Sequence, residues 1–236
     1  MKFNDKVALI AGGTGGLGRA VSQAFLEQGA KVIVTFRKTQ EFEELKAIAG
    51  RDAALVGSDV DVTDQAAVQK LVSEIVTAHG HLDFLVNAVG AYAGGAKLWE
   101  TDARVFDQML QLNLTSGYVL CRAVVPVMRK QRSGAIVNVA SKAAFDHAAG
   151  AAAYAASKAA AVAMMDSLAA ELKGSGVRVN SILPSIIDTD ANRTAMPGAD
   201  FAKWPKPEEI ARVILFLCSD EARLIQGAAI PVYGDS

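Results

Sequence analysis

The sequence predicts an α/β protein built around one doubly wound sheet of about seven parallel strands, with helices on both faces. Short β-branched runs alternate with longer segments of helical periodicity along the whole chain, which is typical of a parallel sheet covered on both faces. A length of 236 residues favours one large domain. Because no repeat, low-complexity tract or charged linker divides the chain, we predict a single domain over residues 1–236.

The predicted elements follow one another with short connections. The strand candidates are residues 7–11, 32–35, 54–56, 84–86, 135–139, 177–182 and 229–232. Between them lie helical segments such as residues 66–78, whose apolar residues recur on one face. Residues 189–207 are the least regular stretch, and their Pro and Gly residues predict a loop or broken helix. We expect this long connection to act as a substrate loop.

Composition excludes several classes of protein. A net charge of −1 gives no reason to expect a nucleic-acid partner. No apolar run approaches the roughly eighteen residues of a membrane-spanning helix, and no signal segment opens the chain, so we expect a cytoplasmic protein with no membrane partner. Cys121 and Cys218 lack metal-like spacing, so we expect buried thiols and no metal site. Arg129, Lys130 and Arg132 form either a solvated helix end or a dock for an acidic carrier protein.

A glycine-rich turn, AGGTGGLG, directly follows the first strand candidate and opens a helix that runs to about residue 28. Glycines let the backbone approach a pyrophosphate, and a helix N-terminus offers unpaired N–H groups with partial positive charge. Two spacings coexist, GxGxxG starting at Gly13 and GxxxGxG starting at Gly12. Gly-rich turns also serve as plain connectors, but this one lies between a strand and a helix. It therefore predicts a Rossmann-type dinucleotide site.

The end of the second strand candidate distinguishes NAD from NADP. NAD-selective sites place an acidic residue there to bind the adenosine ribose hydroxyls, and none occurs between Val32 and Gln40. Arg37 and Lys38 instead place two cations where a 2′-phosphate would lie. We therefore expect NADP in preference to NAD. The alternative interpretation of the two cations is an ordinary solvated strand end.

Four polar residues form the candidate catalytic group. Tyr154 and Lys158 lie four positions apart in the helix-forming segment 151–172, which puts them one turn apart on one face. We expect the ammonium to bring the pKa of Tyr154 down from about 10 toward the range of general acid–base catalysis. Ser141 follows a strand candidate where ligands meet parallel sheets, so its hydroxyl can hold a substrate oxygen. Asn113 lies between leucines in a helical segment and needs a partner if it is buried.

These residues, in this order, resemble the Asn-Ser-Tyr-Lys tetrad of the short-chain dehydrogenase/reductase family, and the likeness spans nearly the whole chain. The glycine turn resembles the family's TGxxxGxG, with Ala in place of the first Thr. Asp61 and Val62 resemble the pair that contacts adenine, and NAVG at 87–90 stands where the family has NNAG. PSIIDT at 184–189 resembles the PGxIxT stretch that contacts nicotinamide, with Ser185 in place of Gly.

The resemblance implies a role for each member of the tetrad. Tyr154 would donate or accept the proton, while Lys158 would lower its pKa and bind the nicotinamide ribose. Ser141 would orient the carbonyl, and Asn113 would hold a water that links Lys158 to solvent. The turn, the strand ends and the resemblance together predict these cofactor-binding residues: Gly12, Thr14, Gly16, Leu17, Gly18, Arg37, Asp61, Val62, Asn87, Ala88, Gly90, Tyr154, Lys158, Pro184, Ile187 and Thr189.

The predicted function is therefore an NADP(H)-dependent oxidoreductase that transfers a hydride between nicotinamide and the carbonyl or alcohol carbon of a small substrate. Candidate substrates are a ketone, a 3-oxoacyl thioester or a pteridine-like ring. The pteridine-like ring is included because residues 192–204 resemble a segment of dihydropteridine reductases, while the remaining chain resembles generic carbonyl reductases. A surface loop that Phe201 and Trp204 anchor to the body is the alternative interpretation of that segment. Substrate specificity is expected from residues 189–207 together with 91–96 and 145–150.

Three alternative functions stay open. The chain is otherwise an NAD-dependent alcohol dehydrogenase of the same family, a non-catalytic NADP-sensing protein, or a structural subunit that pairs with an active relative. A non-catalytic protein has little need of a complete tetrad, which disfavours the last two. Because the family usually forms dimers or tetramers, the resemblance also implies a homodimer or homotetramer.

Overall fold

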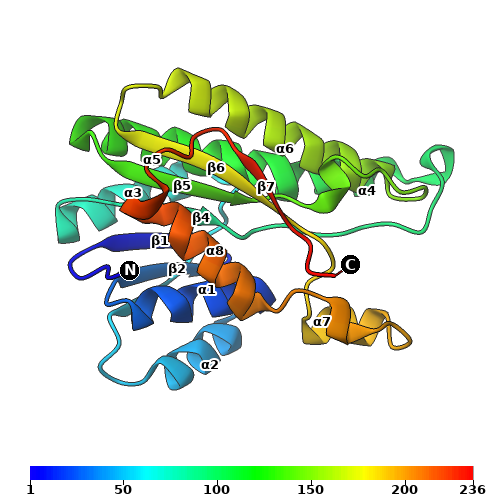
Figure 1. Cartoon of the computed structure of the whole chain (residues 1–236), viewed down its shortest axis with the longest axis horizontal. Coiled ribbons are helices and arrows are strands. Elements are labelled where there is room, and N and C mark those ends of the chain that lie inside the picture. Colours follow the sequence, from blue (N-terminus) through cyan, green and yellow to red (C-terminus); the bar gives the residue numbers. More distant parts are fainter. Residues whose placement is uncertain (236) are drawn as a thin grey trace.

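The computed structural model describes residues 1–235 and contains one parallel sheet of seven strands with helices on both faces (Figure 1). The strands are β1 (Val7–Ala11), β2 (Lys31–Phe36), β3 (Leu55–Asp59), β4 (Phe84–Asn87), β5 (Gly134–Val139), β6 (Val177–Pro184) and β7 (Ala229–Val232). Their order is β3-β2-β1-β4-β5-β6-β7, and all neighbours are parallel. The predicted fold class and the seven predicted strands are confirmed.

Helices cover the sheet in two layers. The helices are α1 (Gly16–Glu27), α2 (Thr39–Ala49), α3 (Gln65–His79), α4 (Ala103–Leu110), α5 (Ser116–Gln131), α6 (Ala152–Glu171), α7 (Asp190–Ala195) and α8 (Pro207–Cys218). Helices α1, α2 and α8 pack on one face, while α3, α5 and α6 pack on the other, with α4 beside α6. Short 3₁₀ helices are η1 (Leu98–Glu100), η3 (Lys142–Ala144), η4 (Phe201–Lys203) and η5 (Asp220–Ala222), and η2 (Gln111–Thr115) is a π-helical turn.

The apolar strand runs are continuous because both faces of the sheet are covered. All five residues of β1 are buried. Ala8 and Ile10 point toward α1 and α8, while Val7, Leu9 and Ala11 join the core under α3 and α5. Successive strand side chains point to opposite faces, so one apolar strand supplies both cores.

The strand order reverses between β1 and β4, which are neighbours in the sheet although β2 and β3 separate them in sequence. Ala11 at the end of β1 is in register with Asn87 at the end of β4. In doubly wound sheets, ligands bind outside the C-terminal strand ends at such a switch point. The fold therefore directs a site to the edge where β1, β4, β5 and β6 end.

The segment that was predicted to be a loop or broken helix is confirmed as one. It contains the short helices α7 and η4 between irregular stretches. Trp204 is 6% exposed, and its ring lies 4.9 Å from that of Phe201, centroid to centroid. The two aromatic residues therefore anchor the loop to the body, as the alternative interpretation expected.

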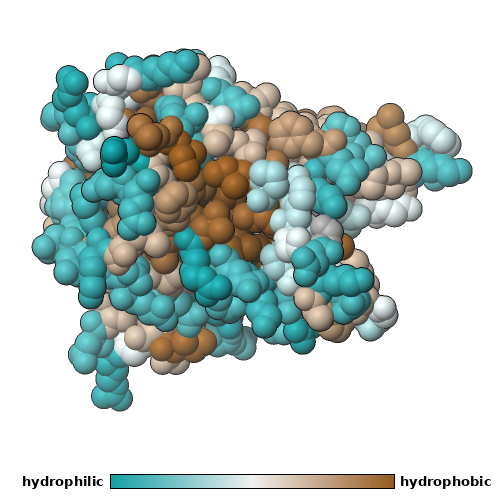
Figure 2. Space-filling view, in the orientation of Figure 1, coloured by the Kyte–Doolittle hydropathy of each residue, from teal (hydrophilic) through white to brown (hydrophobic). Residues whose placement is uncertain are grey.

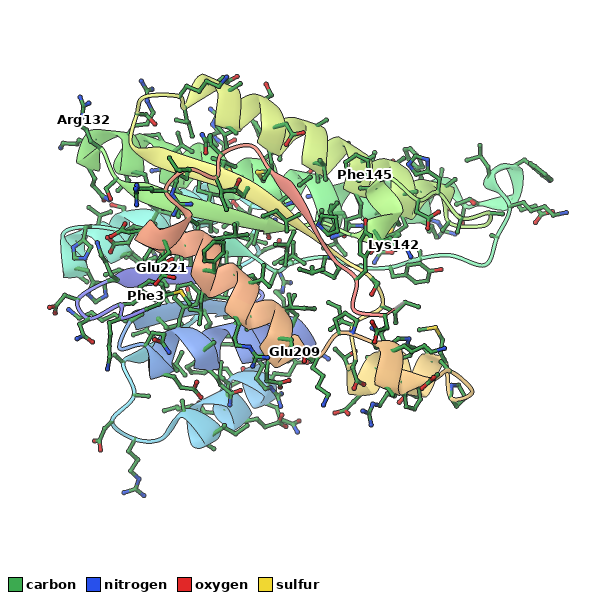
Figure 3. All side chains as sticks on the ribbon, in the orientation of Figure 1. Phe3, Arg132, Lys142, Phe145, Glu209 and Glu221 are labelled. Atoms are coloured by element: carbon green, nitrogen blue, oxygen red, sulfur yellow. The ribbon has the colours of Figure 1, made fainter. Side chains whose placement is uncertain are left out.

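Basic residues gather at the C-terminal end of α5. Arg129 and Lys130 occupy the last turn of α5, and Arg132 follows with a positive φ of 57°. This basic end precedes β5, whereas Lys142 follows β5, so the two lie at different ends of that strand (Figure 3).

Cys121 and Cys218 are buried and unpaired, as predicted. Within residues 1–235, none of the helices has the length and apolar character needed to cross a membrane.

Candidate active site

The glycine turn joins β1 to α1 at the switch point. Gly12 has a φ of +71°, a conformation that other L-residues rarely adopt. A Cβ on Gly18 would overlap the carbonyl of Gly12, and one on Gly16 would come within 2.8 Å of Cγ2 of Thr189. A Cβ on Gly15 would meet no atom closer than 3.6 Å. The backbone thus requires glycine at positions 12 and 18, and the Thr189 side chain crowds position 16, whereas a Cβ at Gly15, which only GxGxxG uses, has open space.

The turn opens onto a cleft of about 520 Å³ that reaches the ends of β2 and β3. The predicted cofactor residues that line it are Gly12, Thr14, Arg37, Asp61, Val62, Ala88 and Gly90. A neighbouring cleft of about 650 Å³ is lined by Thr14, Gly16, Leu17 and Thr189. A cradle of glycines that a Cβ would fill, next to an elongated cleft, fits the pyrophosphate and adenosine of a dinucleotide.

Charged residues at the far end of this cleft are already paired with one another. Nη1 of Arg37 lies 2.8 Å from Oδ2 of Asp61, and Nζ of Lys38 lies 2.9 Å from Oε1 of Glu41. Hydrogen bonds from Thr63, and then Arg37, hold the pKa of Asp61 below its usual range. The hydrogen bond from Lys38, with help from Thr14, lowers the pKa of Glu41 in the same way. Both cations predicted to meet a 2′-phosphate therefore have carboxylate partners.

Tyr154 and Ser141 face a third cleft, of about 450 Å³, at the ends of β5 and β6. Ser141 follows β5, and its Oγ accepts a hydrogen bond from the N–H of Ala143 at 3.2 Å. Pro184 and Ile187 line the same cleft. The structure thus brings the predicted proton donor, carbonyl-orienting hydroxyl and nicotinamide-contacting segment to one place.

Lys158 lies one turn from Tyr154 on α6 and is buried, with only 5% of its surface exposed. Its Nζ donates a hydrogen bond of 3.0 Å to the carbonyl of Val139, the last residue of β5. The same atom lies 6.0 Å from the ring centroid of Tyr154. Burial lowers the pKa of Lys158 from 10.5 to about 8. The two groups share one helix face, as predicted, with the ammonium hydrogen-bonded to the sheet.

The expected direction of the Tyr154 pKa was wrong for this structure. Burial raises the pKa of the phenol above 10, and the hydrogen bond with Ser141 opposes this only in part. Lys158 does not offset the burial, because its ammonium is directed at the Val139 carbonyl. The phenol therefore stays protonated at neutral pH, which suits a proton donor.

Asn113 was predicted to lie in a regular helix. It lies instead in the π-helical turn η2, between α4 and α5. Its side-chain amide exchanges two hydrogen bonds with the backbone of Ala91, at 2.9 and 3.0 Å, and donates another to Oγ of Ser157 at 3.0 Å. A Cβ on Gly90 would come within 2.9 Å of Oδ1 of Asn113 and 3.0 Å of Nζ of Lys158. Asn113 thus fixes the segment after β4 against the buried lysine.

Asn87 lies beneath the site rather than in a cleft. It is 1% exposed, and its Nδ2 donates to Oδ1 of Asn138 on the neighbouring strand at 3.0 Å. Its Oδ1 accepts from the N–H of Val89 at 3.3 Å. This side chain therefore braces β4 against β5 and shapes the segment that contains Ala88 and Gly90.

The family suggested by the tetrad and by the seven-stranded parallel sheet can be checked by comparing the sequence with those of known families. The profile of the short chain dehydrogenase family matches residues 6–199. The chain belongs to the short-chain dehydrogenase/reductase family. It is therefore an NAD(P)-dependent oxidoreductase that acts on CH–OH or C=O groups.

Several members of the family are similar to this dehydrogenase/reductase over its whole length. The 3-oxoacyl-acyl-carrier-protein reductase of Thermotoga maritima is 34% identical, with 99% of this chain and 98% of the relative covered. The D-threitol dehydrogenase of Mycolicibacterium smegmatis is 35% identical, with 99% and 93% covered. The solved structure of ElxO with NADP bound is 26% identical, has a TM-score of 0.90, and covers 99% of this chain and 98% of ElxO.

Two residues of the dehydrogenase/reductase site were not singled out from its sequence. The ring of Tyr92 meets that of Tyr154 edge-on at 5.0 Å between centroids, and Tyr92 lines the same cleft as Tyr154. Ser157, inside the YxxxK motif, is fully buried and bonds Asn113. The segment 91–96 was assigned to specificity, and its one aromatic residue was the available signal for Tyr92.

The glycine turn gives a matched pair of variants. Gly18→Ala should weaken NADPH binding at least tenfold and lower the free energy of unfolding by about 1–3 kcal/mol, because the new methyl group overlaps backbone. Gly15→Ala should change both by little, because its backbone is extended and the space is open. Fluorescence titration with NADPH and urea unfolding measure the two effects. Equal tolerance of both substitutions would contradict the assigned phosphate turn.

Proposed function

We propose that this dehydrogenase/reductase is an NADP(H)-dependent enzyme that interconverts a small carbonyl compound and its alcohol, with Tyr154 as the general acid or base. The observation that carries the proposal is the shared cleft of Tyr154 and Ser141, with Lys158 buried one helical turn away. NADP(H), when bound, supplies or accepts the hydride. The glycine turn and the 520 Å³ cleft would hold it, and the segment 184–189 would contact its nicotinamide.

The chain's own residues would handle the proton. Ser141 would donate a hydrogen bond to the substrate oxygen and orient it toward the phenol. Tyr154, kept protonated by burial, would donate its proton to that oxygen during reduction. During oxidation the phenolate form of Tyr154 would be the acceptor of the proton. Lys158 would stabilise the phenolate that remains. Asn113, which faces Lys158 across Gly90, would hold the water that returns a proton from solvent.

NADP is favoured over NAD by Arg37, which lines the cleft at the end of β2. Its planar guanidinium suits a 2′-phosphate, and β2 ends without an acidic residue. To bind the phosphate, Arg37 would exchange or share its carboxylate partner, Asp61. One observation favours the NAD-dependent alternative, because the ionised Glu41 lines the same cleft and can accept ribose hydroxyls.

The substrate cleft favours a small and largely apolar carbonyl compound, such as a ketone, a 3-oxoacyl thioester or a pteridine-like ring. Its walls include Tyr92, Ile186 and Met196, and its charged residues are the opposite pair Lys142 and Asp146. A relative named for 3-oxoacyl reduction and one named for threitol oxidation support either direction of the reaction.

We also propose a homodimer or homotetramer in the cytoplasm. Strand β7 is a sheet edge, and Figure 2 shows an apolar area over β7 and α8. Phe216, Ile230 and Val232 are partly exposed there. Packing this edge against a second copy of the chain would cover the apolar side chains and the unpaired backbone groups of the edge strand. The buried, unpaired thiols suit a reducing compartment such as the cytoplasm. Cell fractionation would test this location. A light-scattering mass equal to the 24.7 kDa monomer would contradict the assembly.

Tyr154→Phe should lower turnover by roughly 10² to 10⁴, because it removes the transferred proton and keeps the ring. The dissociation constant for NADPH should stay within about twofold of the wild-type value. Tyr118→Phe, on the exposed face of α5, is the matched control and should leave turnover unchanged. Oxidation of NADPH over a panel of carbonyl compounds measures turnover. A wild-type protein that binds NADPH tightly and is silent with the whole panel would instead support the NADP-sensing alternative.

Arg37→Gln should weaken NADPH binding at least tenfold at low salt and leave NADH binding nearly unchanged, since only NADPH carries the 2′-phosphate. Glu41→Gln should instead strengthen NADPH binding, because it releases Lys38 and removes a carboxylate near the phosphate. Titration of each variant with both cofactors gives the ratio of the two dissociation constants. Equal wild-type affinity for NADH and NADPH would contradict the NADP assignment.

A further inference from the structure

Residues 233–235 form a short C-terminal tail that leaves β7 and runs toward the segment that contains α7 (Figure 1). We propose that Tyr233 is a positioning residue: it ties the two walls of the substrate cleft together and so sets the alignment of the substrate. This inference rests on the proposed function of that cleft. It assigns no contact between Tyr233 and the reacting atoms.

The ring of Tyr233 holds the wall that contains the catalytic serine. Nζ of Lys142 lies 5.1 Å from the centroid of this ring, within cation–π range. Figure 3 shows Lys142 beside the C-terminal tail. The ring also packs against a small buried cluster that includes Ala140 and Ala144. Because these two residues flank Ser141 and Lys142, the ring braces the whole turn that presents the Ser141 hydroxyl.

The backbone of Tyr233 holds the opposite wall. Oγ of Ser185 donates a hydrogen bond of 2.6 Å to the Tyr233 carbonyl. Ser185 directly follows β6 and lines the substrate cleft next to Ile186 and Ile187. A glycine at this position would supply no such bond. The serine that replaces the family's glycine therefore gives this wall its own anchor on the tail.

The tail then reaches the substrate loop. The N–H of Asp235 donates to the carbonyl of Lys203 at 3.2 Å. Gly234 has a φ of +62°, and a Cβ there would come within 3.0 Å of the same carbonyl and 3.2 Å of Pro205. The close approach needs glycine. Three segments far apart in sequence, 140–144, 185–187 and 203–205, are thus held by three consecutive tail residues.

These contacts predict an effect on substrate that is separable from cofactor binding. Two of the segments that the tail ties, 140–144 and 185–187, line the Tyr154 cleft, and the third, 203–205, belongs to the loop that also supplies Asn192 and Met196 to that cleft, whereas the glycine turn and Arg37 line the other clefts. Loosening the tail should therefore misplace the carbonyl relative to Ser141 and Tyr154 and spare the adenosine end. A displacement of about 1 Å at a reacting centre is enough for a large loss of rate.

The chain offers a built-in reporter for this test. It has two tryptophans, the 79% exposed Trp99 and the buried Trp204, which adjoins Pro205. A Trp99→Phe background leaves Trp204 as the sole tryptophan, at the point where the tail meets the substrate loop. In that background we would compare Tyr233→Ala, Ser185→Gly and the matched control Tyr233→Phe, which keeps the ring. The backbone carbonyl of residue 233 is present in all three.

Tyr233→Ala should lower kcat/KM for the carbonyl substrate by roughly tenfold to a hundredfold, with KM for NADPH within about twofold of the parent. Its Trp204 emission should shift to longer wavelength. Tyr233→Phe should lie much closer to the parent than Tyr233→Ala does in both measurements, because it keeps the ring beside Lys142, and Ser185→Gly should show a weaker effect of the same kind as Tyr233→Ala. The light-scattering mass of each variant should equal that of the parent.

Unchanged kinetics and emission in Tyr233→Ala would overturn the proposal. So would a parallel loss of NADPH affinity and of the unfolding midpoint, or a change of mass, because each would show a general structural role. A parent enzyme that reduces no carbonyl compound would refute the proposed function. The emission of Trp204 in Tyr233→Ala and Tyr233→Phe would still decide whether the tail holds the loop.

Discussion

The burial of the Lys158 ammonium at the end of β5 is the constraint around which the proposed active site is arranged. A buried cation costs several kcal/mol unless partners compensate it, and here the Val139 carbonyl accepts its hydrogen bond. The pKa of about 8 reflects that cost. Asn113 and Gly90 pack around the same group, and the π-turn of Asn113 is a local departure from regular helix. Such departures and perturbed groups are typical of functional sites.

The parallel sheet explains why so many separate segments meet at this lysine. The strands β1, β4, β5 and β6 end at one edge, so the glycine turn, the segment after Asn87, Ser141 and Pro184 are brought together without long-range pairing of their own. Helix α6 then presents Tyr154 and Lys158 to that edge. The clefts proposed for cofactor and substrate lie along this edge, and the C-terminal tail is hydrogen-bonded to the segment 189–207 beside it.

The sheet and the tetrad could be predicted from the sequence because each leaves a local pattern. Strands covered on both faces read as short apolar runs, and Tyr154 and Lys158 lie one turn apart in a clear helix. The pairing of Arg37 with Asp61 and the direction of the Tyr154 pKa could not be predicted, since they depend on where distant side chains point. Tyr233 was missed for the same reason, because its partners are distant in sequence.

The most direct measurement is the pH dependence of stability for the wild type and Lys158→Met without cofactor. Below pH 8 the lysine is charged in both states, and between about pH 8 and 10.5 the unfolded state binds more protons, so wild-type stability rises with pH. From pH 7 to about pH 9.5, urea unfolding should show the wild type gaining about 2 kcal/mol relative to Lys158→Met. If the difference in the free energy of unfolding between the two proteins stayed the same over this pH range, the burial of the Lys158 ammonium and its lowered pKa would be contradicted.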